Sequence, residues 1–191
     1  MNKTRIKDLT MMAICLALLV VCSKISIPIG SIPLTLQTFA VFIIALVLGV
    51  KKSVIVFITY IVIGLIGIPV FSTGGGIQYV FMPSFGFIIG FLLAAPVIGI
   101  GSKSNQFYTK YIVSIIGLLI INISGVIYMY LIFNYYKNVS KDLLNIIQIG
   151  VLPFIVKDIF TAILSCLIYS RIKVLLYKDN KCNELLLNDT K

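Results

Sequence analysis

The stretch from Val151 to Ile168 reads Val-Leu-Pro-Phe-Ile-Val-Lys-Asp-Ile-Phe-Thr-Ala-Ile-Leu-Ser-Cys-Leu-Ile, an apolar run long enough to cross a bilayer as a helix. Two adjacent charges, Lys157 and Asp158, lie within it. A charge at the centre of a transmembrane helix costs about 2.5 to 3.5 kcal/mol on insertion scales, so such residues usually face a polar cavity or each other. The pair therefore predicts a binding or conducting site. The structural alternative is that Lys157 extends to the membrane surface while Asp158 bonds to a neighbouring helix.

The composition of the whole chain also indicates a membrane protein. Of its 191 residues, 60% are hydrophobic and 12% are charged, and the mean hydropathy is +1.10. Soluble domains have about 25% charged residues. The net charge of +10 could indicate nucleic-acid binding, but the basic residues lie at the ends of apolar segments and not in one run. We therefore expect an all-α integral membrane protein, surrounded by membrane lipid and without a nucleic-acid partner.

Six apolar segments can be marked, each near the length of about 20 residues that spans a bilayer core. Their limits are 8–25, 36–50, 53–68, 84–101, 109–135 and 146–175. Only a few residues separate the second segment from the third, so these two are expected to form a tight antiparallel pair. The six helices would make up a membrane domain of residues 1–176, followed by a polar C-terminal tail of residues 177–191.

The positions of Lys and Arg predict the orientation. With Lys157 set aside inside the membrane, a cytoplasmic N-terminus places twelve basic residues inside and three outside, namely Lys24, Lys137 and Lys141. Basic residues are enriched in cytoplasmic loops. Both termini are therefore expected to be cytoplasmic, in a multi-pass protein of the cell (plasma) membrane.

The connector between the third and fourth segments is unusually apolar. It has no charge, and it contains the consecutive glycines Gly74, Gly75 and Gly76 and aromatic residues that include Phe71 and Tyr79. We favour a lid in which the glycines form a hinge and the aromatic side chains close over a flat ligand. The alternative is a loop that lies in the membrane interface, where aromatic residues are enriched.

The chain lacks the residues of an active site. It has no His, and its four Cys show no paired spacing, so a metal site or a Ser-His or Cys-His pair is not expected. Asp158 is the one carboxylate in the interior of an apolar segment, since Asp8 stands at the very start of the first one. We therefore expect a protein that is not an enzyme and that uses no metal and no cofactor.

Five motifs that occur in order resemble the BioY family, the biotin-specific S components of energy-coupling factor (ECF) transporters. They are Ala13-xxx-Ala17, Ile32-Pro-Leu-Thr-Leu-Gln-Thr38, Gly64-xx-Gly67-Ile-Pro-Val-Phe71, Gly74-Gly-Gly and Pro83-xx-Gly86-Phe-xx-Gly90-Phe91. The resemblance implies a bundle of six transmembrane helices with an external pocket beneath the first and third loops. It also implies a transmembrane coupling subunit and two ATPase subunits as partners. In that family a pair of small residues in the first helix contacts the coupling subunit, and Ala13 and Ala17 match this pair.

The last helix departs from the family pattern at two positions. The pattern is Pro-Phe-xx-Gly-Asp-xx-Lys, in which the Asp and the Lys bind the ureido ring of biotin. Pro153, Phe154 and Asp158 match it, but Lys157 stands in place of the Gly and Thr161 in place of the Lys. Successive residues of a helix point about 100° apart, so Lys157 is not expected to replace the missing lysine.

We therefore expect high-affinity binding and uptake of biotin, with Asp158 holding the ureido ring. Its candidate neighbours are Gln37, Tyr79, Asn122 and Thr161. Asn122 has a structural alternative, since neutral polar residues at mid-depth also bond across helices. Two other functions stay open: uptake of another vitamin, such as thiamine or riboflavin, and a self-sufficient proton-coupled carrier that uses Asp158. A structural membrane subunit without a ligand is disfavoured by the uncharged, glycine-rich connector.

Overall fold

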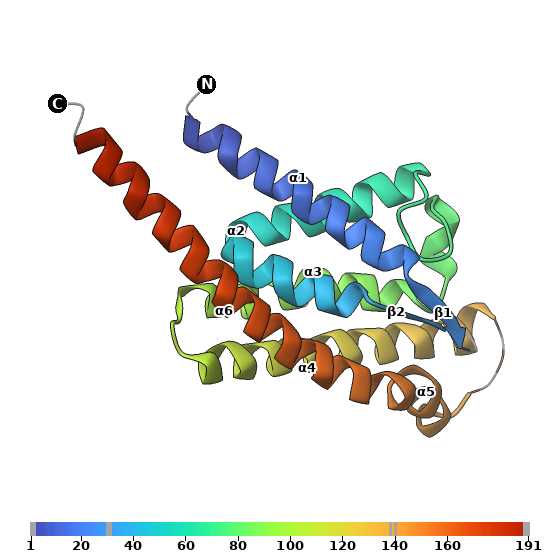
Figure 1. The fold of residues 1–191 in the computed structure, drawn as a ribbon. Helices are drawn as coiled ribbons and strands as arrows, with labels where there is room; N and C mark the ends of the chain where they lie inside the picture. The colour runs from blue at the N-terminus through green and yellow to red at the C-terminus, as the bar shows by residue number, and fades with distance from the viewer. Residues whose placement is uncertain (1–2, 30–31, 138, 140, 189–191) are drawn as a thin grey trace.

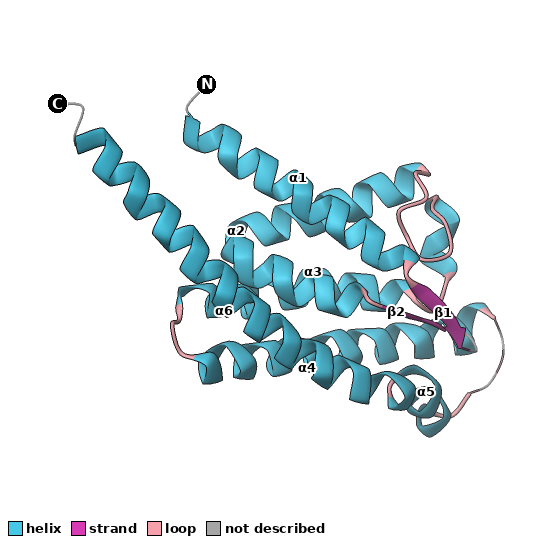
Figure 2. Cartoon of the chain, viewed as in Figure 1, coloured by secondary structure: helices cyan, strands magenta, loops and turns pink. Residues whose placement is uncertain are grey.

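A computed structural model describes residues 3–29, 32–137, 139 and 141–188. Its helices are α1 (Lys3–Lys24), α2 (Gln37–Ile66), α3 (Phe85–Ile100), α4 (Phe107–Leu131), α5 (Leu143–Gly150) and α6 (Leu152–Asn188). Shorter elements are the strands β1 (Ser26–Ile29) and β2 (Ile32–Thr35), the 3-10 turns η1 (Ile77–Phe81) and η2 (Gly101–Lys103), and a π-helical turn, η3 (Ile132–Tyr136). Figures 1 and 2 show a bundle of long helices with the two strands at one end. Among the described residues, five helices are long and apolar enough to cross a membrane.

Helix α2 folds back on itself at Gly49. This residue has φ 70° and ψ −174°, which no α-helix contains. Gln37 Nε2 donates a hydrogen bond to Tyr60 Oη at 2.9 Å, whereas a separation of 23 positions would span about 35 Å in a straight helix. The arms on either side of Gly49 are therefore the antiparallel pair expected from segments 36–50 and 53–68. With these arms counted separately, the described part of the chain has the six apolar helical segments that the sequence predicts.

The segment 146–175 is divided where one helix was expected. Helix α5 ends at Gly150 and α6 begins at Leu152. Pro153 favours the break, because proline has no N–H to donate and fits best in the first turn of a helix, where Pro153 lies in α6. Helix α6 then continues to Asn188 and so includes most of the predicted polar tail, whose last residues, 189–191, lie outside the described residues.

The two termini are at the same end of the bundle. Figure 1 shows α1 beginning and α6 ending on the side away from the strands. This arrangement agrees with two cytoplasmic termini. The strands β1 and β2 pair antiparallel, with Pro28 opposite Pro33, and they lie at the other end, which the predicted orientation places outside the cell.

Helix α3 packs against α4 through glycines. A Cβ added at Gly90 would lie 2.8 Å from the Cα of Ile121, and one added at Gly86 would collide with Tyr128. Ser124 Oγ also donates a hydrogen bond to the carbonyl of Gly86 at 2.9 Å. The two helices therefore approach each other as closely as their backbones allow, which holds the cavity-facing side of α3 in place.

Gly90→Leu is expected to destabilise the protein by about 1 to 3 kcal/mol, the usual effect of forcing extra methylenes into a packed interface. The measurement is the thermal unfolding temperature in detergent. The matched control is Leu93→Phe, which adds bulk on the same helix at a side chain that is 52% exposed. The control should unfold at the temperature of the wild type. Equal unfolding temperatures for Gly90→Leu and the wild type would contradict the close packing.

Candidate ligand-binding site

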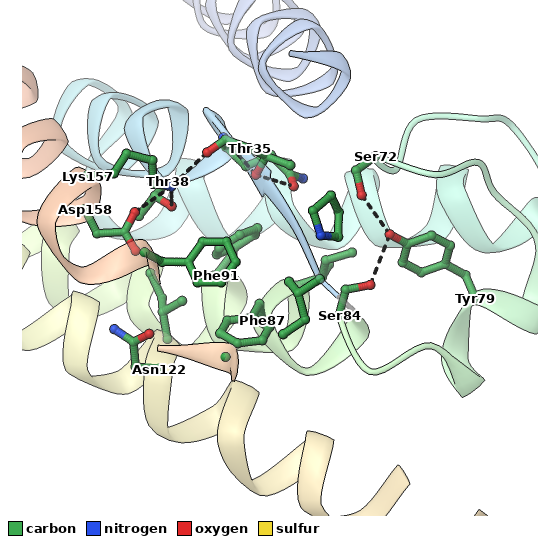
Figure 3. A pocket seen from close by; sticks show the side chains of 17 residues that line it. Thr35, Thr38, Ser72, Tyr79, Ser84, Phe87, Phe91, Asn122, Lys157 and Asp158 are labelled. Carbon is green, nitrogen blue, oxygen red and sulfur yellow. Dashed lines mark hydrogen bonds and ion pairs between the residues drawn. The ribbon is translucent and has the colours of Figure 1, made fainter. Parts of the chain in front are cut away.

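A cavity lies at the end of the bundle that carries the strands (Figure 3). It has a volume of about 540 Å³ with its open mouth included, within the range of small-molecule sites. Its wall comes from β2, from the connector that follows α2, and from α2, α3, α4, α5 and α6. The lining residues are Ile32, Pro33, Thr35, Gln37, Thr38, Ser72, Tyr79, Ser84, Phe87, Ile88, Phe91, Ile121, Asn122, Gly150, Phe154, Lys157 and Asp158.

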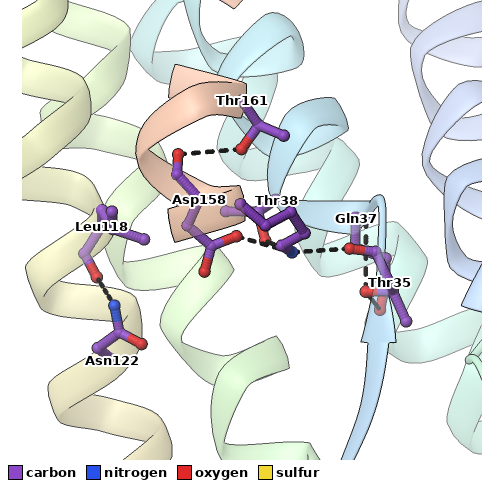
Figure 4. Close-up of polar contacts among 8 residues, drawn as sticks. Thr35, Gln37, Thr38, Leu118, Asn122, Asp158 and Thr161 are labelled. Carbon is purple, nitrogen blue, oxygen red and sulfur yellow. Dashed lines mark hydrogen bonds and ion pairs between the residues drawn. The ribbon is translucent and has the colours of Figure 1, made fainter. Parts of the chain in front are cut away.

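Helix α6 brings Lys157 and Asp158 together at this wall. The Nζ atom of Lys157 lies 2.7 Å from Oδ1 of Asp158. It also donates hydrogen bonds to the backbone oxygen of Thr35, at 2.8 Å, and to Oγ1 of Thr38, at 3.3 Å (Figure 3; Figure 4 shows the polar contacts around Asp158). The Lys157 side chain thus reaches Asp158, although the two residues are about 100° apart around the helix. The 100° between successive residues fixes the directions of their Cβ atoms, whereas the four-carbon Lys side chain is long enough to turn back.

The carboxylate of Asp158 keeps capacity to accept hydrogen bonds. Asp158 is 5% exposed. The ion pair with Lys157 does not have the geometry of a hydrogen bond, and no residue in the described part of the chain donates one to Oδ1. Oδ1 is nonetheless ion-paired with Lys157 at 2.7 Å, and a carboxylate can accept hydrogen bonds from more than one partner. This carboxylate is therefore suited to a ligand that supplies N–H groups.

Three of the four expected neighbours of Asp158 line the cavity. Gln37 is held by its bond to Tyr60, and Asn122 donates to the carbonyl of Leu118, one turn earlier in α4, at 3.1 Å. The hydroxyl of Tyr79 lies within hydrogen-bonding distance of Ser72 and Ser84.

The fourth expected neighbour, Thr161, is buried but does not line the cavity. Its hydroxyl donates to the backbone oxygen of Asp158 at 3.0 Å (Figure 4). This contact is local to α6, as is common for Thr in helices. The structure therefore places Thr161 next to Asp158 but outside the cavity wall.

The connector after α2 contributes hydroxyl groups to the cavity and keeps its glycines away from it. Gly74, Gly75, Gly76 and Phe71 are absent from the cavity wall. Phe71 is fully buried against a cluster of three aromatic rings, namely Tyr60, Tyr79 and Phe85. Gly74 and Gly76 have φ of 137° and 104°, and Gly76 N–H donates to the carbonyl of Gly64 at 2.7 Å. The glycines thus form a tight turn that is bonded to the end of α2.

Sequence reasoning missed the part of the cavity wall made by Ser72, Ser84 and Phe87. A signal for Phe87 exists, since Phe87 and Phe91 lie one helical turn apart next to the glycine face of α3. Nothing in the sequence marks the two serines, because the fold of the connector decides which of its hydroxyls face inward.

The first helix presents Ala13 and Ala17 on its exposed side. Neither alanine is buried by another part of the described chain, whereas Cys15 and Leu19 of the same helix are buried in the core. Among the described residues, no cluster of His, Cys, Asp or Glu could hold a metal ion.

Comparisons with known proteins agree with this architecture. The sequence model of the BioY family matches residues 1–178. A probable biotin transporter BioY of Lysinibacillus sphaericus is 40% identical over 168 residues, which is 86% of each chain. The biotin transporter BioY of Thermotoga maritima is 38% identical over 161 residues, or 83% of this chain and 91% of that one.

A crystal structure gives the same result for the fold. The S-component for biotin from an ECF-type ABC transporter superposes with a TM-score of 0.80 at 27% identity, covering 91% of this chain and 94% of that chain. The all-α, S-component-like bundle and the multi-pass membrane location expected from the sequence are thus confirmed. The chain belongs to the BioY family.

Proposed function

We propose that this protein binds biotin from outside the cell and mediates its uptake as the S component of an ECF transporter. The observation that carries the proposal is the buried carboxylate of Asp158, which lines the cavity and can accept further hydrogen bonds. The relatives described above are biotin transporters. Since they are transporters, the chain itself is not expected to be an enzyme, and ATP hydrolysis is assigned to two ATPase subunits.

The two ends of the cavity differ in a way that suits biotin. The ureido ring of biotin has two N–H donors, which Asp158 would accept. Figure 3 shows the hydroxyls of Ser72, Tyr79 and Ser84 on the other side of the cavity from Asp158. These donors would bind the carboxylate of the biotin side chain. Phe87 and Phe91 lie between the two ends and would contact the apolar ring system and chain.

The connector between α2 and α3, residues 67–84, is the third loop, and it is proposed to act as the lid of this cavity, since its Ser72 and Tyr79 line the cavity. Opening it would break the bonds that hold the loop to α1. Ser23 Oγ donates to the carbonyl of Val70 at 2.6 Å, and Lys24 Nζ donates to that of Phe71 at 2.6 Å. Gly74, Gly75 and Gly76 would take up the change in backbone direction.

The test is direct binding of biotin, thiamine and riboflavin to the purified protein by calorimetry, together with mass spectrometry of any co-purified small molecule. Biotin alone is expected to bind and to co-purify. Binding of thiamine or riboflavin in its place would overturn the proposal. Biotin uptake that persists in cells without the ATPase subunits, and that an uncoupler abolishes, would favour a self-sufficient proton-coupled carrier.

A further inference from the structure

The cavity contains both members of an ion pair. Among its lining residues, Lys157 and Asp158 are the only charged ones, and their charged atoms are 2.7 Å apart. The other ion pair in the described part of the chain, between Asp8 and Lys52, involves half-exposed side chains outside this cavity. The cavity wall therefore carries two opposite charges and no net charge.

The protein itself holds the Lys157 ammonium in place. Its Nζ donates hydrogen bonds to the carbonyl of Thr35 at 2.8 Å and to Oγ1 of Thr38 at 3.3 Å, and it is ion-paired with Oδ1 of Asp158 at 2.7 Å. Thr35 and Thr38 belong to the junction of β2 with α2, so a second part of the fold also holds the ammonium of Lys157 (Figure 3). Its charge thus stays beside Asp158 without help from a ligand.

A fixed cation changes which ligand Asp158 prefers. A buried carboxylate without a counterion makes its strongest bonds with a cationic donor. With Lys157 at 2.7 Å, the negative charge is already balanced, and a second cation placed on the free side of the carboxylate would lie close to the first and be repelled. A neutral group with N–H donors meets no such repulsion and still gains the hydrogen bonds.

We propose that Lys157 sets the charge selectivity of the cavity. As a fixed internal counterion of Asp158, it makes the site accept a neutral polar ring and reject a cationic ring of the same shape. This inference rests on the proposed function, because the ureido ring of biotin is the neutral ring concerned. It gives Lys157 a role in specificity that is separate from any direct contact with the ligand.

The probe is 2-iminobiotin, in which an imino group replaces the ureido oxygen so that the ring is a cationic guanidinium at neutral pH. Calorimetry would give Kd for biotin and for 2-iminobiotin with the wild type, Lys157→Met and Lys157→Arg. The wild type is expected to prefer biotin by at least about a hundredfold, and Lys157→Met should lower this preference at least about tenfold. Lys157→Arg keeps the charge and should keep the preference.

The alternative is that Lys157 only stabilises the β2–α2 junction through its hydrogen bonds to Thr35 and Thr38, and this alternative predicts a different result. In that case Lys157→Met would weaken the binding of both ligands by the same factor, and the inference would be overturned. Lys157→Gln removes the charge but keeps a donor for Thr35, so it must show the same loss of preference as Lys157→Met. Thermal unfolding in detergent would detect misfolding of Lys157→Met, and in that case Lys157→Gln still tests the inference.

The proposed function and the inference fail in distinguishable ways. A wild type that binds no biotin would overturn both. A wild type that binds biotin tightly, with a preference over 2-iminobiotin that Lys157→Met and Lys157→Gln leave unchanged, would overturn the inference alone.

Discussion

Asp158→Asn is expected to weaken biotin binding by about 1.5 to 3 kcal/mol, which is roughly a 10- to 150-fold rise in Kd. Asp158 is buried, and its Oδ1 receives no hydrogen bond from the described residues. The N–H groups of a ureido ring would make charge-assisted bonds with the carboxylate, which are stronger than bonds to the neutral oxygen of Asn. Titration calorimetry on the purified protein measures the difference.

The matched control for this variant is Asp142→Asn. The side chain of Asp142 accepts the N–H of Leu143 at 2.8 Å and caps α5, and it lies exposed outside the cavity. Asn caps a helix as well as Asp does, so biotin affinity should not change. The two variants should be compared at matched thermal stability, because Asp158→Asn leaves Lys157 without its counterion. An unchanged Kd in Asp158→Asn would exclude Asp158 from ligand binding.

The fold could be predicted because few backbone structures are stable inside a membrane. Backbone groups inside the bilayer must be satisfied within the chain, so long apolar segments form helices, and the six predicted segments do. The predicted limits were inaccurate where a local break interrupts a helix. A single non-helical residue, Gly49, turns the two arms of α2, and Pro153 marks the point where α5 and α6 separate.

Some residues of the site could be predicted from the sequence, each for its own physical reason. A charge in an apolar segment is expensive, so Asp158 was visible without any structure. Gln37 begins α2 next to a proline-containing strand, and the fold carries that junction to the cavity. Helical periodicity does not predict where the end of a long or freely rotating side chain points. The ammonium of Lys157 turns toward the carboxylate of Asp158, and the hydroxyl of Thr161 donates to the backbone oxygen of Asp158 in the same helix.

Ala13→Trp combined with Ala17→Trp is expected to reduce biotin uptake by cells at least about tenfold, because close helix contact requires small side chains at the interface. Both alanines are exposed on one side of α1 and do not belong to the core of the described part of the chain. Large side chains there should therefore leave the fold and the Kd for biotin unchanged. The effect should appear only in the assembled transporter, as loss of uptake and loss of co-purification with the coupling subunit.

The control that isolates this surface is Leu119→Trp. Leu119 is 56% exposed on α4, on the far side of the bundle from α1 in Figure 1, so the same bulk there should face lipid and leave uptake unchanged. Normal uptake by the double Trp variant would show that the coupling subunit binds elsewhere. A higher Kd for biotin in that variant would show that α1 supports the cavity itself. The support would come from Ser23 and Lys24, which donate hydrogen bonds to the third loop. Binding and uptake measured together therefore separate the partner surface from the ligand site.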